Sequence, residues 1–271
     1  MATELIAVYV ALGALVGFLA GLLGIGGGMT IVPLLVALFT LQGFALEHVL
    51  PLAIGTAAAT IVFTSLSSAR AHHAHGAVDW SIVRAMAPGL VIGSLVGPQI
   101  ATALPARTMA AVFAVFMGFT AWRMVRNAQP KPSRSLPSAP GLFGVGAGIG
   151  LLSGIVGAGG AFLSVPFMVR CNVRMHAAVA TSSALGMPIA LAATAGFVIA
   201  GMRKSGLPPH SLGFVYLPAL GAIVVASMLT APIGARTAHR WPVKKLKRAF
   251  ALLLYVLAAY MLWKAWASGG G

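Results

Sequence analysis

Ten apolar runs, separated by short polar or basic segments, make up most of the chain. An apolar stretch of about 20 residues with few charges is long enough to cross a lipid bilayer as a helix. The pattern therefore predicts an all-α polytopic membrane protein. The runs cover residues 5–24, 29–41, 51–69, 82–103, 108–125, 141–157, 161–171, 177–200, 212–235 and 249–266.

The runs form two sets of five that resemble each other. A polar, proline-rich stretch at 127–140 separates them and is typical of a linker. At a constant offset the residues Gly13, Gly17, Gly21, Gly24, Gly26, Gly27, Val32 and Pro33 match Gly146, Gly150, Gly154, Gly157, Gly159, Gly160, Val165 and Pro166. With small indels, Thr56, Pro98 and Pro105 match Thr181, Pro232 and Pro242. We therefore predict a duplicated ancestor, with a first membrane repeat at 1–126 and a second at 141–271.

Each repeat begins with a glycine-rich stretch, at 21–33 and 154–166. Residues 5–41 as one helix would extend roughly 55 Å, far beyond a hydrocarbon core of about 30 Å. The helix must break at the glycines. Two geometries remain, a broken helix that crosses once and a helical hairpin whose arms leave on the side they entered. The run from Leu5 lacks a basic n-region, so we interpret it as a membrane segment and not as a cleaved signal.

The basic residues favour the hairpin. If both stretches are hairpins, fourteen of the eighteen Lys and Arg residues fall on one side of the membrane, whereas single crossings divide them equally. The positive-inside rule makes the richer side cytoplasmic and places both termini outside and the linker inside. The fourteen are Arg70, Arg84, Arg123, Arg126, Lys131, Arg134, Arg170, Arg174, Arg236, Arg240, Lys244, Lys245, Lys247 and Arg248.

Five helical segments per half is an odd number, so the second half enters the membrane upside down relative to the first. We therefore predict two inverted-topology repeats, each a glycine-broken helical hairpin plus three transmembrane helices, as in many secondary transporters. The two hairpins enter from opposite sides, so their tips can meet near the midplane.

Composition narrows the chemistry. Apolar residues make up 59% of the chain and charged residues 8%, and the only acids are Glu4, Glu47 and Asp79. Carboxylate metal sites and two-carboxylate enzymes therefore have almost no residues to use. The net charge of +15 is explained by loop residues that set topology and meet lipid headgroups, not by nucleic acid. Cys171 is the only cysteine, which excludes an internal disulfide.

The glycine stretches are the candidate site. Gly26, Gly27 and Gly28, like Gly159, Gly160 and Ala161, would let a ligand approach the backbone. Unwound backbone survives in a membrane only where protein or a water-filled cavity surrounds it. We expect the second arm to begin near Thr30 with Pro33 in its first turn, and Ser164 with Pro166 to repeat this arrangement. Two helix N-termini would then converge and favour a small anion.

Hydroxyl groups downstream of each stretch are candidate further donors to the anion, and a glutamine inside an apolar run is a candidate for lining the path. An alternative for the hydroxyls is a bond to the carbonyl four residues earlier. Gly13, Gly17 and Gly21 are expected to serve helix packing. The candidates are Thr56, Thr60, Thr181, Ser182, Ser183 and Gln99.

Other chemistry is less well supported by the sequence. His72, His73 and His75 are interpreted as an interfacial loop, so we expect no metal and no cofactor. Ser153 could suggest a serine hydrolase, but its match in the first half is Ala20 and no histidine is placed to act as its base. An intramembrane enzyme or lipid-handling protein remains the alternative to a transporter, and a homodimer is left open.

The paired motifs, Gly-Leu-Leu-Gly-Ile-Gly-Gly-Gly and Gly-Ile-Val-Gly-Ala-Gly-Gly-Ala with Val-Pro after each, and the downstream Thr56 and Thr181-Ser-Ser183, resemble the sulfite exporter TauE/SafE family of membrane transporters. The resemblance covers nearly the whole chain. It implies movement of sulfite, thiosulfate, sulfoacetate or another sulfonate across a bacterial inner membrane. Family members often carry Thr-Ser after the second segment, whereas the first copy here reads Thr56-Ala57. We therefore expect two unequal half-sites.

Overall fold

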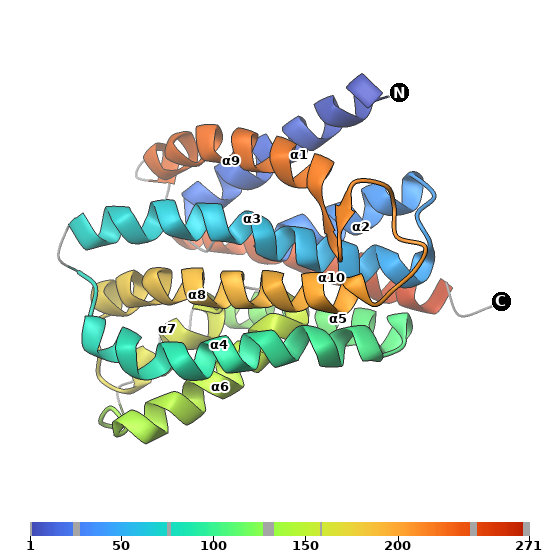
Figure 1. Cartoon of the computed structure of the whole chain (residues 1–271). Coiled ribbons are helices and arrows are strands. Elements are labelled where there is room, and N and C mark those ends of the chain that lie inside the picture. The colour runs from blue at the N-terminus through green and yellow to red at the C-terminus, as the bar shows by residue number, and fades with distance from the viewer. Residues whose placement is uncertain are drawn as a thin grey trace.

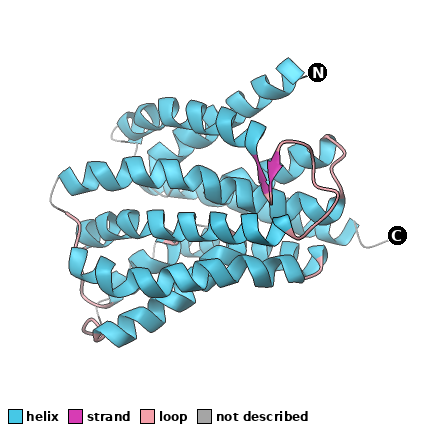
Figure 2. Ribbon diagram, in the orientation of Figure 1, coloured by secondary structure: helices cyan, strands magenta, loops and turns pink. Residues whose placement is uncertain are grey.

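A computed structural model of the chain describes residues 2–23, 28–74, 77–126, 133–157, 159–238 and 243–267. In this part of the chain helices dominate, with one short two-stranded ribbon (Figures 1 and 2). The elements are α1 (Ala2–Leu23), α2 (Gly28–Leu41), α3 (Leu46–Ala74), α4 (Trp80–Ala103), α5 (Ala106–Arg126), α6 (Ala139–Val156), α7 (Ala161–Arg170), α8 (Met175–Met202), β1 (Ser211–Leu212), β2 (Val215–Tyr216), α9 (Leu217–Ala238) and α10 (Val243–Ala267).

The predicted all-helical membrane architecture is confirmed. Every apolar run corresponds to a helix, and the ends agree within a few residues for most of them. Among the described residues, five helical stretches are long and apolar enough to cross a membrane, and they belong to α3, α4, α5, α6 and α8. The protein is therefore a multi-pass helical membrane protein.

Helices from the two halves exchange partners. The first helix of each half packs against the fourth helix of the other, so α1 lies on α9 and α6 lies on α4. Glycines make these contacts very close: a Cβ on Gly13 would lie 2.7 Å from Ile223 Cα, and one on Gly146 would lie 2.5 Å from the Met86 carbonyl oxygen. Gly17 meets Ser227 in the same way. The predicted packing role of Gly13 and Gly17 is thus confirmed, because no larger side chain would fit.

The third helices of the two halves, α3 and α8, pack together and run antiparallel. Gly55, early in α3, faces Phe197, late in α8, and Ser65, further along α3, lies against Gly186, which comes earlier in α8. The fifth helices α5 and α10 also pack on each other. In Figure 1, α1 begins and α10 ends at the same, right-hand end of the bundle.

The ribbon β1–β2 was not predicted, since three of its four residues were included in the apolar run at 212–235. Tyr216 of β2 packs edge-on against Phe39 and Phe44, with ring centroids 5.5 and 5.3 Å apart. Tyr9 lies beside it and accepts a hydrogen bond of 2.6 Å from the Gln42 side-chain amide. The loop before α9 is therefore anchored against helices of the first half.

The expected position of the two prolines was wrong. Helix α2 begins at Gly28, two residues before Thr30, and α7 begins at Ala161, so Pro33 and Pro166 each stand sixth in their helix and not in its first turn. Both helices begin closer to the glycines than expected, and α7 follows directly on Gly160, whose φ of 72° lies in the left-handed region that glycine adopts readily. Each proline therefore removes the backbone donor for a carbonyl four residues earlier.

Candidate functional site

The two glycine-rich segments meet in the structure. Gly28 opens α2, and a Cβ at this position would lie 3.0 Å from the carbonyl oxygen of Gly157, which follows α6. Ile61 of α3 lies against both segments, because its side chain would contact a Cβ at Gly28 at 2.5 Å and one at Gly159 at 3.3 Å. The breaks of the two halves are therefore neighbours, although they are far apart in the chain. Gly26 and Gly27 lie outside the described residues.

The second break has a backbone that requires glycine. Gly157 and Gly160 have φ angles of 66° and 72°, in the left-handed region that other residues rarely adopt. A Cβ at Gly157 would lie 2.5 Å from Ile54 Cγ2, and one at Gly160 would collide with Ile189 Cδ1. Conformation and space therefore exclude a side chain at both positions, and Ala161 follows as the first residue of α7.

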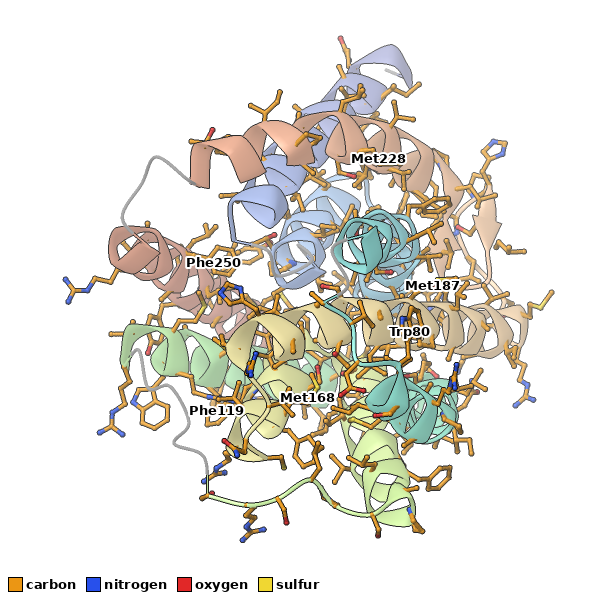
Figure 3. The ribbon with its side chains drawn as sticks, turned by 90° about the vertical axis from the view of Figure 1, so that its left-hand side faces the viewer. Trp80, Phe119, Met168, Met187, Met228 and Phe250 are labelled. Carbon is orange, nitrogen blue, oxygen red and sulfur yellow. The ribbon has the colours of Figure 1, made fainter. Side chains whose placement is uncertain are left out.

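Helix α7 begins at this break with backbone donors that no carbonyl of its own helix can bind. Its first α-helical hydrogen bond runs from the Ser164 N–H to the Gly160 carbonyl, at 2.9 Å. The N–H groups of Ala161 and Phe162 precede this bond and have no carbonyl within the helix to bind. Together with the helix dipole they favour a negative charge. Figure 3, which looks from the left-hand side of Figure 1, shows Met168 of α7 inside the bundle, where its side chain is fully buried.

Thr56 and Thr181, which the sequence placed among the ligand donors, connect the two halves. Thr56 Oγ1 accepts a hydrogen bond of 3.0 Å from the Tyr216 N–H, and Thr181 Oγ1 accepts one of 2.9 Å from the Asp79 N–H. Both threonines are fully buried. Each lies on the third helix of its half and binds the residue immediately before the fourth helix of the other half. The two bonds therefore occupy matching positions in the two predicted repeats.

The remaining predicted hydroxyls mostly bind within their own half. Thr60 donates to the Thr56 carbonyl at 2.9 Å and Ser183 to the Val179 carbonyl at 3.1 Å, which is the back-bonding alternative. Ser182 and Ser164 are hydrogen-bonded at 2.7 Å and buried. Ser164 also donates to the Gly160 carbonyl at 3.0 Å.

The Ser182–Ser164 bond belongs to the second half only. The first half carries Ala57 and Ile31 at the matching positions, and both are buried apolar residues. Two hydroxyls near the second break are thus replaced by an apolar contact near the first. The two breaks differ chemically in the way that Ala57 predicted.

Gln99 connects two helices. Its side-chain amide donates to the Gly196 carbonyl of α8 at 2.9 Å. Because Gly196 packs closely on Pro98, the bond fixes α4 on α8 at a glycine contact. Whether Gln99 also lines a path stays a prediction.

Arg123 is a residue that the sequence reasoning missed. Its guanidinium Nη1, from α5, lies 3.5 Å from the Phe162 carbonyl oxygen in the first turn of α7. That carbonyl has no helical partner because residue 166 is proline. Pro166 could have signalled an unpaired carbonyl, but no pattern in the sequence placed the end of α5 beside α7.

Asp79 was also missed. Besides the backbone bond to Thr181, its carboxylate caps α4 by accepting hydrogen bonds from the N–H groups of Ser81 and Ile82. The Ser81 hydroxyl adds a bond of 2.6 Å. These bonds, led by that from Ser81, lower the pKa of Asp79 below its usual value. The Asp79 carboxylate thus caps α4, and the backbone N–H of Asp79 donates to Thr181 of the other half. The side chains of His72 and His73, and His75 altogether, lie outside the described residues.

The fold and the site define a class. Broken helices from two similar halves of a multi-pass membrane protein meet inside the bundle, as they do in many transporters. The family model for "Sulfite exporter TauE/SafE" matches residues 9–261. The chain therefore belongs to the TauE/SafE family of membrane transporters.

Curated relatives agree with this assignment. A "Probable membrane transporter protein" of Haemophilus influenzae is 35% identical over 254 residues, which cover 93% of this chain and 96% of the relative. YdhB of Bacillus subtilis, named "Probable membrane transporter protein", is 26% identical over 88% of this chain and 92% of its own length. A protein of Methanocaldococcus jannaschii with the same description is 22% identical over 95% and 96% of the two chains. These names indicate a transporter and not an enzyme. No solved structure matches the chain significantly.

Proposed function

We propose that the protein is a secondary transporter that moves a small sulfur-containing anion across the inner membrane by alternating access. The anion is sulfite, thiosulfate, sulfoacetate or another sulfonate, and it binds near the midplane between the two helix breaks. The observation that carries this proposal is the contact of the breaks, where Gly28 faces the Gly157 carbonyl. Transporters with broken helices bind substrates at such points.

The inverted relation of the halves is part of the proposal. Equivalent helices α3 and α8 are antiparallel, which is the direction an inverted repeat requires and a parallel repeat forbids. The exchanged pairs α1–α9 and α6–α4 obey the same symmetry. Two halves related in this way can expose a central site first to one side and then to the other.

The orientation follows from charge. We infer that both termini are periplasmic and that the linker at 127–140 is cytoplasmic, because the end of the bundle opposite the termini would then hold fourteen of the eighteen basic residues. The common end of α1 and α10 supports this arrangement (Figure 1). A reporter fused to the C-terminus should be active only outside the cytoplasm, and a cytoplasmic signal would contradict the topology.

An anion suits the chemistry at the breaks. The three acids of the chain stand at or just before the starts of α1, α3 and α4, none of them on α6 or α7. The free N–H groups of α7 attract negative charge without holding it as tightly as a fixed cation would, so release remains possible. The family description adds sulfur oxoanions as the first substrates to test.

Flux into proteoliposomes tests the proposal. Vesicles with purified protein should move at least one of sulfite, thiosulfate and sulfoacetate faster than empty vesicles. Gly27→Leu and Gly160→Leu should each abolish this flux while the protein still inserts in the membrane. Gly118→Leu is a control, since nothing lies within 4 Å of a Cβ at Gly118. Absence of flux with every oxoanion, together with product formation from a lipid or peptide, would favour an intramembrane enzyme.

A further inference from the structure

Ser153 of α6 carries a buried hydroxyl that nothing in the fold explains. Only 1% of the residue is exposed, and its Oγ has no hydrogen-bond partner among the residues that the structure describes. Burial removes the water that would otherwise bind such a group. Native proteins therefore pair nearly all of their buried hydroxyls, and an unpaired one indicates a missing partner.

Other hydroxyls in the helices make a hydrogen bond within their own helix that Ser153 does not make. Thr60, Ser183 and Thr194 each donate to the carbonyl four residues earlier, at 2.9, 3.1 and 2.7 Å. Ile149 stands four residues before Ser153 in the same helix, yet Ser153 Oγ makes no such bond. The hydroxyl instead lies 3.5 Å from the point that a Cβ on Gly160 would occupy.

This position directs the hydroxyl at the second break. Gly160 is the residue before α7, and the point that a Cβ on it would occupy is close to both Ser153 Oγ and Ile189 Cδ1. The N–H groups of Ala161 and Phe162, which no carbonyl of α7 can bind, follow directly. A hydroxyl donor and the first N–H donors of α7 thus lie near the second break, and no acid stands on α6 or α7. Such a set of donors matches the oxygens of an oxoanion.

We propose that the Ser153 hydroxyl donates a hydrogen bond to an oxygen of the transported oxoanion, which is held at the start of α7. The inference rests on the proposed function and adds a specificity-determining residue to it. Ala20 stands at the matching position of the first half. The second break is therefore the stronger anchor for the anion, and the first break contributes mainly backbone.

The Ser153→Ala variant tests the assignment with two readouts. Thermal unfolding of the purified protein without anion should occur at or above the wild-type temperature, because the substitution removes a buried hydroxyl that lacks a partner. The apparent affinity for sulfite, thiosulfate or sulfoacetate, from thermal shifts and from proteoliposome flux, should fall about tenfold, which corresponds to about 1.4 kcal/mol. Ser153→Cys keeps a weak donor of similar size, so its affinity for the anion should lie between those of the wild type and Ser153→Ala.

Thr194→Val is the matched control, because the Thr194 hydroxyl is bonded to the Ala190 carbonyl and its loss should not alter the affinity. Wild-type affinity in Ser153→Ala would overturn the inference, and so would a variant that is less stable without anion but binds normally. Wild-type protein that binds and moves none of the three anions would overturn the proposed function, and the assignment of Ser153 with it. If the wild-type protein transports one of the anions and Ser153→Ala transports it equally well, only the assignment of Ser153 is overturned.

Discussion

Thr56 of the first half accepts a hydrogen bond from the backbone N–H of Tyr216 in the second, at 3.0 Å, and Thr56 is fully buried. Thr181 accepts the equivalent bond from Asp79 at 2.9 Å. Each bond joins a third helix to the residue immediately before a fourth helix of the opposite half. The bonds therefore fix the two halves against each other near the proposed site.

Removing one of these acceptors should destabilise the protein. Thr56→Val keeps the shape of the side chain but leaves the Tyr216 N–H without its partner, so the free energy of unfolding should fall by about 1 to 2 kcal/mol. Thr181→Val should have a similar effect through Asp79. Thermal unfolding in detergent measures both.

The matched control for these variants is Thr60→Val. Its hydroxyl donates to the Thr56 carbonyl within the same helix, so its loss leaves no backbone group without a partner. Thr56→Ser should retain most of the stability because the acceptor oxygen remains. Equal unfolding temperatures for Thr56→Val and Thr60→Val would show that the bond between the halves contributes nothing.

The glycines of the second break should not tolerate alanine. Gly157→Ala and Gly160→Ala place a Cβ on left-handed backbone, at about 1 to 2 kcal/mol each, and the new methyl groups would meet Ile54 and Ile189. We expect lower thermal stability and reduced flux for both variants.

Glycines with open space provide the contrast. A Cβ at Gly118 or Gly148 has no neighbour within 4 Å, and alanine is the better helix former by up to about 1 kcal/mol. Gly118→Ala and Gly148→Ala should therefore be neutral or stabilising. Similar losses at all four positions would indicate that the break has no special geometry.

The sequence predicted the helices better than their partners. Apolar runs are local, so their lengths and ends could be read directly, and the glycine periodicity identified both breaks. Which helices a glycine face contacts depends on the whole fold. No feature near Gly13 pointed to Ile223 on α9, and none near Gly146 pointed to α4.

The same difference applies to the site residues, whose positions could be predicted but whose partners could not. The hydroxyl positions were identified, but Thr56 and Thr181 bind backbone donors of the opposite half, in strand β2 and in the loop before α4, whose positions the sequence could not supply. The sequence suggests Ser153 only as a nucleophile, for which no histidine is placed to act as base. Its significance depends on the absence of a partner, which only coordinates reveal.

Asp79 should make the stability of the folded protein depend on pH in the acidic range. Its folded pKa is lowered, chiefly by the Ser81 hydroxyl, so its stabilising effect is present above its ordinary value of about 3.9 and is lost as the pH falls through the lowered value. Asp79→Ala should lower stability at neutral pH by about 1 kcal/mol through loss of the cap.

Unfolding temperatures between pH 6 and pH 3 test this. Asp79→Asn keeps a capping oxygen and should flatten the acid dependence, while Ser81→Ala should move it toward higher pH. None of these changes alters the backbone bond to Thr181. A wild-type acid dependence that persists in Asp79→Asn would assign it to another group.

Arg123 and Pro166 should be energetically coupled. Pro166 leaves the Phe162 carbonyl without its helical donor, and Arg123 supplies a replacement at 3.5 Å, a long hydrogen bond. Arg123→Gln should therefore lower the free energy of unfolding by about 0.5 to 1 kcal/mol. In the Pro166→Ala background the alanine N–H can bind the Phe162 carbonyl directly, so the same change should cost less.

Arg126→Gln is the control. It changes an exposed residue stacked on Trp122 and should be nearly neutral in both backgrounds. Strict additivity of Arg123→Gln and Pro166→Ala in this cycle would mean that the guanidinium does not replace the missing amide.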